Sequence, residues 1–276
     1  MTDRYAVIGN PINHSKSPLI HGMFAEATSQ DIVYTTIEGP FGGFAGAVDA
    51  FREAGGLGMN VTAPFKLDAF AYSGAGTERS PRAQLAGAVN AMKFDGHRVI
   101  VENFDGVGLV RDVTHNLKCA LKGRRILMLG AGGAARGALL PFLEQQPACL
   151  VIANRHLDKA LELAALGAAQ GNVIVSGYGE LEGQTFDVVL NATSASLRAE
   201  LPPVPTTVFA FGCIAYELAY GKGLTPFLRL AQNAGVTQLA DGVGMLAEQA
   251  AEAFAWWRGV RPDTQAVIDA IAIPLV

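Results

Sequence analysis

A glycine-rich turn near the middle of the chain has the residue types and spacing of a dinucleotide-binding site. It follows the apolar run 125–129, which has the length of a buried strand, and it opens a helix-like segment, 134–143. In such a turn Gly130 gives the sharp bend, Gly132 lets a pyrophosphate approach the backbone, and Ala135 lets the helix pack on the strand. The free N–H groups of the helix then bind the phosphates. Similar turns occur in α/β proteins that bind nothing there, so the flanking strands carry the interpretation.

The strand after this turn ends in residues that favour NADP over NAD. NAD-binding proteins usually have an Asp or Glu here for the ribose 2′-hydroxyl, but the run 149–153 ends at Asn154, Arg155 and His156. Arg155, with Lys159 one helical turn further on, places positive charge where a 2′-phosphate would bind. The alternative is an ordinary solvated helix start, because charged side chains are mostly on surfaces.

Hydride transfer to or from an alcohol needs a group that gives or takes the hydroxyl proton, and Lys66 is the first candidate for it. Lys66 lies between Phe65 and Leu67 in the first turn of a helix expected after Pro64. Apolar neighbours and the positive end of the helix dipole both disfavour the ammonium form there, which suits a proton shuttle. The alternative is a solvated surface lysine.

Asp105 is the natural partner of Lys66, since its charge could hold the lysine in place at an expected junction between domains. A plain helix N-cap would have the same sequence. Ser15 and Ser17 flank the start of the first expected helix, where hydroxyl and N–H groups can bind a carboxylate. Capping alone already explains Ser17, with Pro18 at the first helical position.

The elements that must position these residues alternate between strand and helix. Before residue 103 we expect strands at 5–8, 32–37 and 57–61, with helices at 17–27, at 44–54 and after Pro64. This order favours parallel pairing. Residues 73–80 predict a loop, and Asp95-Gly96-His97 predicts a hairpin turn between strands at 88–94 and 98–101. A helix from Asn103 to about His115 would bridge two domains.

The pattern from residue 125 onward predicts a doubly wound parallel sheet. Strands are expected near 126–129, 149–153, 172–175, 186–190, 213–216 and 236–239, mostly with helices between them. Thr225 caps an expected helix to Ala234, and two more helices, about 243–258 and 262–270, follow the sheet. The predicted fold class is α/β, with a mixed-sheet first domain and a Rossmann-type second domain.

Composition limits the classes of function. The chain has 276 residues, 50% of them hydrophobic, and a mean hydropathy of +0.26, which is ample for a core. A net charge of −4 without a strong basic cluster argues against nucleic acid, and no apolar run approaches the roughly 18 residues of a membrane span. Three cysteines without paired spacing predict a reducing, cytoplasmic location, and the five histidines show no metal-ligand pattern, so no metal is expected.

Motifs spread through nearly the whole chain, taken together, resemble the shikimate dehydrogenase family. In chain order they are Gly9–Pro18, Asn60–Lys66, Ala86–Asn90, Asn103–Gly106, Gly130–Arg136, Asn191–Ser194, Tyr216–Gly223 and Ala240–Leu246. This combination is far more specific than the glycine turn alone.

The resemblance implies reversible NADPH-dependent reduction of 3-dehydroshikimate to shikimate, a step of aromatic amino-acid biosynthesis, with Lys66 and Asp105 as the catalytic pair. The implied substrate contacts are Ser15, Ser17, Asn60, Thr62, Asn90, Tyr216 and Gln249. The expected cofactor contacts are Gly130, Ala131, Gly132, Gly133, Ala134, Asn154, Arg155, His156, Lys159, Thr193 and Gly242.

The resemblance also implies a division into domains. A substrate domain, residues 1–105, would be hinged across a cleft against a cofactor domain, residues 106–241. C-terminal helices, residues 242–276, would pack back on the substrate domain. We expect a monomer or a homodimer.

Several residues depart from the family pattern. Phe104 replaces the usual Thr beside Asp105, which would put an apolar ring near the substrate. His156 and Lys159 stand where Thr and Arg are usual, and Ser196 and Glu217 where Gly and Asp are common. Phe104 and His156 keep open a paralogous activity on quinate or an aminoshikimate with NAD. A non-catalytic NADP-binding regulator is the other alternative, and retention of both Lys66 and Asp105 argues against it.

Overall fold

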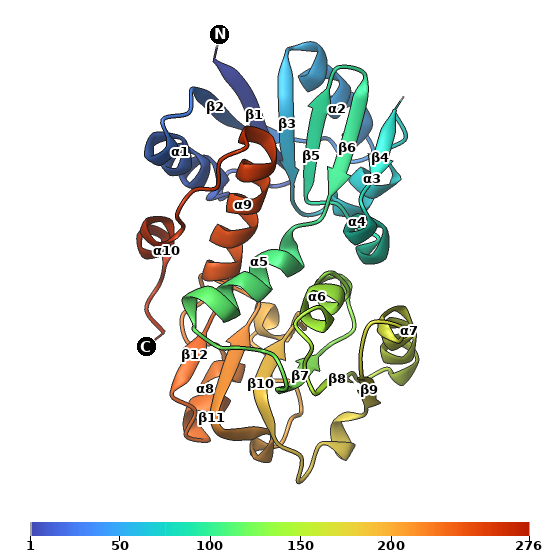
Figure 1. Cartoon of the computed structure of the whole chain (residues 1–276), viewed down its shortest axis with the longest axis vertical. Helices are drawn as coiled ribbons and strands as arrows, with labels where there is room; N and C mark the ends of the chain where they lie inside the picture. Colours follow the sequence, from blue (N-terminus) through green and yellow to red (C-terminus); the bar gives the residue numbers. More distant parts are fainter. Residues whose placement is uncertain (1, 75, 276) are drawn as a thin grey trace. The chain divides into compact units, whose positions relative to one another are not determined.

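The alternation of strands and helices produces two separate sheets, each in its own compact unit (Figure 1). The structure is a computed structural model that describes residues 2–74 and 76–275. Unit 1 comprises Met1–Gly108 and Ala247–Ile271, and unit 2 comprises Leu109–Leu246 and Ala272–Val276. The domain limits predicted from the sequence stay predictions, since these units are defined by packing alone.

Unit 1 is built on a mixed sheet. Its strands are β1 (Asp3–Gly9), β2 (Ile32–Glu38), β3 (Gly56–Val61), β4 (Thr77–Arg79), β5 (Ala91–Asp95) and β6 (Arg98–Glu102), in the spatial order β2-β1-β3-β5-β6-β4. Strand β1 pairs in parallel with β2 and β3, as the βαβ alternation predicts, whereas β5 runs antiparallel to β3 and β6. The predicted hairpin is confirmed, with Asp95 opposite Arg98.

Helices cover both faces of this sheet. They are α1 (Ser17–Thr28), α2 (Phe44–Glu53), α3 (Lys66–Ala71), α4 (Pro81–Ala86), most of α5 (Asp105–Arg111), most of α9 (Val243–Arg258) and α10 (Gln265–Ile271). Because successive strand residues face opposite sides, Ala6 and Ile8 pack with Phe44 of α2, while Tyr5 packs with Trp257 of α9.

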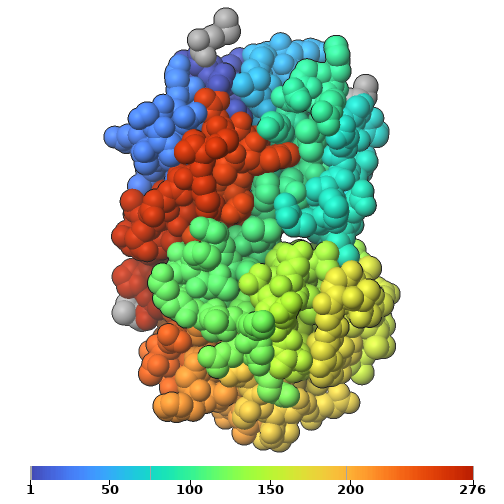
Figure 2. Space-filling model, viewed as in Figure 1, coloured from blue at the N-terminus to red at the C-terminus, as the bar shows by residue number. Residues whose placement is uncertain are grey.

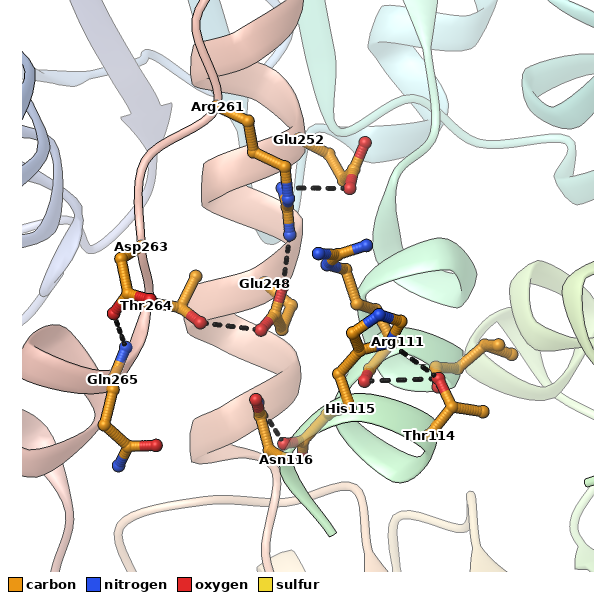
Figure 3. Close-up of polar contacts among 12 residues, drawn as sticks. Arg111, Thr114, His115, Asn116, Glu248, Glu252, Arg261, Asp263, Thr264 and Gln265 are labelled. Carbon is orange, nitrogen blue, oxygen red and sulfur yellow. Dashed lines mark hydrogen bonds and ion pairs between the residues drawn. The ribbon is translucent and has the colours of Figure 1, made fainter. Parts of the chain in front are cut away.

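The C-terminal helix α9 is an integral part of unit 1. The Tyr5 and Trp257 rings stack with centroids 4.8 Å apart, and Trp257 Nε1 donates to the Met92 carbonyl at 3.0 Å. In Figure 2 the red C-terminal segment accordingly lies against the blue N-terminal segment. Beyond α9, Arg261 contacts Glu248 and Glu252 (Figure 3). The segment leading to α10 is therefore anchored to α9.

Unit 2 contains the predicted doubly wound parallel sheet. Its strands are β7 (Arg125–Leu129), β8 (Cys149–Ala153), β9 (Val173–Ser176), β10 (Phe186–Asn191), β11 (Phe209–Glu217) and β12 (Gln238–Ala240), in the order β12-β11-β10-β7-β8-β9. All pairings are parallel. The strand order reverses between β7 and β10, and ligands of such sheets bind at the carboxyl ends of the strands at this point.

Apolar cores lie on both faces of this second sheet. Helices α6 (Gly133–Leu143) and α7 (Leu157–Gly167) pack on one face, and α8 (Pro226–Asn233) packs on the other. Short 3₁₀ segments at Tyr178–Glu180, Ala195–Arg198 and Thr206–Val208 complete the unit, and a π-helical turn, Asp112–Asn116, continues α5. Strands buried on both faces explain the continuous apolar runs of the sequence.

Two local predictions are corrected by the structure. The N-cap of α1 is Lys16 rather than Ser17. Helix α3 begins at Lys66, so Lys66 lies in the first turn of a helix after Pro64, as predicted. Residues 73–80, predicted as a loop, contain β4, which pairs with β6. A three-residue edge strand is too short to show an alternating pattern in the sequence.

Candidate active site

Lys66 and Asp105 form an ion pair in unit 1. Lys66 Nζ lies 2.6 Å from Asp105 Oδ2, and the two side chains are 34% and 18% exposed. The two groups therefore form a charge-assisted hydrogen bond. The apolar neighbours of Lys66 in the sequence are Phe65 and Leu67. Of these neighbours only Phe65 is buried, because Leu67 is 67% exposed. The pair is therefore charged, shielded and still reachable by a small molecule.

Asn90 and Asn103 fix the orientation of Asp105. Asn90 Nδ2 donates to Asp105 Oδ1 at 2.8 Å, and Asn90 Oδ1 accepts from the Phe104 N–H at 2.9 Å. The Asp105 N–H donates to Asn103 Oδ1 at 3.0 Å. The side chain of Asn103 thus serves the start of α5, and the carboxylate of Asp105 is left to bind Lys66 and Asn90 instead of capping the helix.

A chain of hydrogen bonds extends from this pair toward β2. Asn60 Nδ2 donates to the Asn90 carbonyl at 3.2 Å, and Tyr34 Oη donates to Asn60 Oδ1 at 2.7 Å. Asn90 Nδ2 also lies 3.2 Å from Gln249 Oε1 on α9. Asn60, Asn90 and Gln249, three of the predicted substrate contacts, are therefore in one network with Lys66 and Asp105.

Three more predicted substrate contacts lie at the ends of elements of unit 1. Ser15 and Ser17 lie at the start of α1, and Thr62 lies just after β3. The Ser17 N–H donates to Ser15 Oγ at 3.3 Å, so it is the hydroxyl of Ser15 that binds the backbone at the start of α1. Thr62 follows β3, with its N–H bound to the Ile8 carbonyl at 3.0 Å. All three side chains are half-buried, which leaves each of them partly open to solvent.

Phe104 is buried in the apolar core of unit 1. The residue is 4% exposed and packs in the apolar cluster with Ala253 and Trp257. Its ring meets the edge of Trp256 at 5.6 Å between centroids, and the Arg82 guanidinium lies 5.8 Å from its centre. Phe104 thus acts as a core residue of unit 1 beside Asp105, and its aromatic character is explained by this packing.

Tyr34 and His21 are missing from the sequence prediction. The His21 ring stacks on Tyr34 with centroids 4.2 Å apart and an interplanar angle of 6°. His21 is fully buried, and neither ring nitrogen has a hydrogen-bond partner in the described part of the chain. Burial lowers the pKa of His21 to about 3, and Asn60 opposes this shift. Burial also raises the pKa of Tyr34. No local pattern in the sequence identifies them, because their partners lie on other elements.

The glycine turn of unit 2 has the geometry of a phosphate site. Gly130 has a φ of +104°, and its N–H donates to the Ala153 carbonyl at 2.8 Å. A Cβ added at Gly132 or Gly133 would meet no atom within 4 Å. Helix α6 begins at Gly133 without a side-chain cap. Open space before uncapped N–H groups fits the pyrophosphate of a dinucleotide, with Ala131 and Ala134 in the same turn.

The residues expected at the 2′-phosphate lie between β8 and α7 and in the first turn of α7. Arg155, His156 and Lys159 are exposed, and Asn154 Nδ2 donates to the His156 carbonyl at 2.9 Å. Within residues 2–74 and 76–275 no salt bridge involves Arg155 or Lys159. Both cations are thus available to an anionic ligand, which fits a nucleotide with a 2′-phosphate.

The remaining predicted contacts are more enclosed. Tyr216 is fully buried, its hydroxyl donates to Asp112 Oδ2 at 2.6 Å, and the Met245 N–H donates to it at 3.3 Å. Burial raises the pKa of Tyr216 well above its usual value. A Cβ at Gly242 would lie 2.2 Å from the Leu218 carbonyl, so this position requires glycine. Roles for Tyr216 and Gly242 in ligand binding stay predictions.

Comparison with known proteins identifies the family. The model of the shikimate dehydrogenase substrate-binding domain matches residues 7–92, that of shikimate/quinate 5-dehydrogenase matches 112–199, and that of the shikimate 5′-dehydrogenase C-terminal domain matches 242–272. A shikimate dehydrogenase (NADP(+)) from Nitrosospira multiformis is 56% identical over 97% of this chain and 96% of its own. The chain belongs to the shikimate dehydrogenase family. A second member, from Chromobacterium violaceum and of the same name, is 54% identical over 97% of each chain.

Solved structures agree with this assignment. An Ael1 enzyme from Pseudomonas putida has 61% identity and a TM-score of 0.96, with 100% of both chains covered. The shikimate 5-dehydrogenase from Thermus thermophilus, in complex with NADP(H) and shikimate, has 30% identity and a TM-score of 0.85, with 98% of both chains covered. The Rossmann-type assignment of unit 2 is thereby confirmed.

Two further features bear on the class of protein. No helix in the described residues is both long and apolar enough to cross a membrane. Within the same residues, no group of three or more His, Cys, Asp or Glu side chains could hold a metal ion.

Proposed function

We propose that the chain catalyses the reversible NADPH-dependent reduction of 3-dehydroshikimate to shikimate, with Lys66 and Asp105 handling the proton. The ion pair of 2.6 Å between them carries this proposal, because it places an ammonium group held by a fixed carboxylate in unit 1. Relatives 53–56% identical over nearly the whole chain are named shikimate dehydrogenase (NADP(+)), which supports both the substrate and the cofactor.

The proton step follows from the chemistry of the pair. When bound, NADPH would supply the hydride for the carbonyl carbon, and NADP⁺ would accept a hydride in the reverse direction. In reduction, Lys66 Nζ gives a proton to the carbonyl oxygen as it becomes a hydroxyl, and in oxidation the neutral amine takes that proton back. Asp105 Oδ2 holds Nζ, while Asn90 holds Asp105 Oδ1. Lys66 is thereby kept in one place through both directions of the reaction.

The substrate is held by polar groups of unit 1. Ser15 and Ser17 bind its carboxylate, and Asn60, Thr62, Asn90 and Gln249 bind its hydroxyls. The direct support is that Asn60, Asn90 and Gln249 already share one hydrogen-bond network with the catalytic pair.

The cofactor is held by unit 2. The turn Gly130–Ala134 binds the pyrophosphate, and Thr193 and Gly242 complete the site. Arg155 and Lys159, with Asn154 and His156, bind the 2′-phosphate. The open space at Gly132 and Gly133 and the exposed side chains of Arg155 and Lys159 support this assignment.

Initial rates of shikimate oxidation by the purified protein, with NADP and with NAD and with quinate in parallel, test the proposal. A high kcat/KM for shikimate with NADP is expected. Turnover only with quinate, with an aminoshikimate or with NAD would favour a paralogous dehydrogenase. Binding of NADP without turnover of any of these substrates would favour a regulator.

A further inference from the structure

A buried carboxylate lies at the carboxyl ends of the parallel strands in unit 2. Glu217 ends β11 and is fully buried. Its Oε2 accepts from Asn191 Nδ2 at 2.9 Å, from Thr225 Oγ1 at 3.2 Å and from Ser196 Oγ, and its Oε1 accepts from the Ala219 N–H at 3.3 Å. Burial of a carboxylate is costly, and burial indeed raises the pKa of Glu217 while these donors lower it.

No cation pairs with Glu217 among the residues that the structure describes. Its partners are neutral donors: side chains from the end of β10, from the 3₁₀ segment after it and from the N-cap of α8, and the Ala219 N–H just after β11. We call Glu217, Asn191, Ser196 and Thr225 the Glu217 cluster. Ser196 and Glu217, two departures from the family pattern that the sequence left unexplained, are thus partners in one contact.

The Glu217 cluster determines which way the Asn191 amide points. A carboxylate is only an acceptor, so the Asn191 NH₂ must face Glu217 and the carbonyl Oδ1 must face the other way. On that other side Asn191 Oδ1 accepts from Thr193 Oγ1 at 2.7 Å and from the Thr193 N–H at 3.2 Å. The charge on Glu217 therefore makes Asn191 an acceptor for Thr193.

Thr193 lies beside the glycine turn. A Cβ added at Gly130 would be 3.1 Å from Thr193 Cγ2 and 3.1 Å from the Ala192 carbonyl. In the sheet register Leu129, just before the turn, lies opposite Asn191, and Asn191 lies opposite Glu217. The three strand ends form a row next to the point where the strand order reverses, which is where a dinucleotide binds in such sheets.

We propose that Glu217 is a positioning residue for the cofactor: through Asn191 it holds Thr193 against the glycine turn in the orientation that binds NADP. This inference rests on the proposed cofactor site. Glu217 touches no ligand in this proposal, but it affects the affinity for the cofactor. This role is separate from the contribution to stability that any buried, hydrogen-bonded polar group makes.

The first test is Glu217→Gln in the full chain. The amide keeps the shape but removes the charge and replaces one acceptor oxygen with a donor, so Asn191 loses the charged acceptor that fixes its orientation toward Thr193. We expect the Kd for NADP, titrated by NADPH fluorescence, and the KM for NADP to rise about tenfold, because small displacements of binding groups have effects of this order. The KM for shikimate should stay within about twofold.

Thr264→Val is the matched control. Thr264 Oγ1 donates to the buried Glu248 at 2.7 Å, the same kind of hydroxyl-to-carboxylate bond, but in unit 1 (Figure 3). We expect Thr264→Val to lower the thermal unfolding midpoint without changing the Kd for NADP. If Glu217→Gln also lowers only the midpoint, Glu217 is structural and the inference is wrong.

Thr193 variants test the same connection from its other end. Thr193→Val loses the hydroxyl that Asn191 holds and should weaken NADP binding, while Thr193→Ser keeps it and should bind NADP nearly as wild type does. In Glu217→Gln/Thr193→Val the two effects should not add, because both break one connection. Equal binding by Thr193→Val and Thr193→Ser would refute the inference, as would additive effects. Failure of the wild-type protein to bind NADP would instead refute the proposed function.

Discussion

The burial of His21 makes the stability of unit 1 sensitive to acid. The pKa of His21 falls from 6.5 to about 3 on folding because the ring is removed from water. Between these values the unfolded chain binds a proton at His21 that the native protein does not bind, so the free energy of unfolding falls as the pH falls through this window. Above pH 6.5 this loss is absent.

The size of the effect follows from the window. Each pH unit below 6.5 removes about 1.4 kcal/mol, so lowering the pH from 7 to 4.5 should cost roughly 2.5 kcal/mol through His21 alone. His21→Phe keeps the ring that stacks on Tyr34 but has no proton to bind. It should therefore lose less stability than the wild type between these two pH values, by roughly that amount.

Urea unfolding at pH 7 and at pH 4.5 measures this difference. Both tryptophans, Trp256 and Trp257, lie in unit 1, so their fluorescence follows the unit that contains His21. His14→Phe, which changes an exposed histidine of the same unit, is the control and should behave like the wild type. If His21→Phe and the wild type lose the same free energy of unfolding on acidification, the argument from burial is refuted.

Three further predictions concern the proposed chemistry and the backbone. Lys66→Met should lower kcat by roughly 10² to 10⁴ with a KM for shikimate within a few-fold, since a proton relay acts in the transition state; a near-normal kcat would remove Lys66 from the mechanism. Arg155→Ala should raise the KM for NADP much more than that for NAD, and equal increases would exclude a 2′-phosphate contact. Gly242→Ala should lower the free energy of unfolding by about 2 kcal/mol or more, because its Cβ would lie 2.2 Å from the Leu218 carbonyl. Denaturant unfolding that shows no loss would contradict this contact.

Much of the fold follows from local patterns in the sequence. Strands of unit 2 are continuous apolar runs between glycine or proline signals, and such runs predict a parallel sheet covered on both faces. The glycine turn after β7 is equally visible, because Gly130 needs a positive φ that other residues rarely adopt. These signals are local, so one sequence is enough to read them.

The rest depends on contacts between residues far apart in the chain. Asn60, Asn90 and Asp105 each look like ordinary turn or cap residues, and only the pairing of β3 with β5 and the start of α5 bring them together. The return of α9 to unit 1, through Trp257 on Tyr5, came from the resemblance to the family and from no local pattern. The role of Tyr34 has no local signal either, since its partner Asn60 lies on another strand.

The proton-handling pair and the residues assigned to NADP are encoded in different units of this chain. Lys66, Asp105 and Asn90 lie in unit 1, whereas the glycine turn, Arg155 and Thr193 lie in unit 2. Each group is held by hydrogen bonds within its own unit. Mutation can therefore adjust the choice of nicotinamide cofactor without rebuilding the proton-transfer groups, and the reverse also holds. For an engineer, or for evolution, cofactor preference and substrate chemistry become two traits that can be varied and recombined separately.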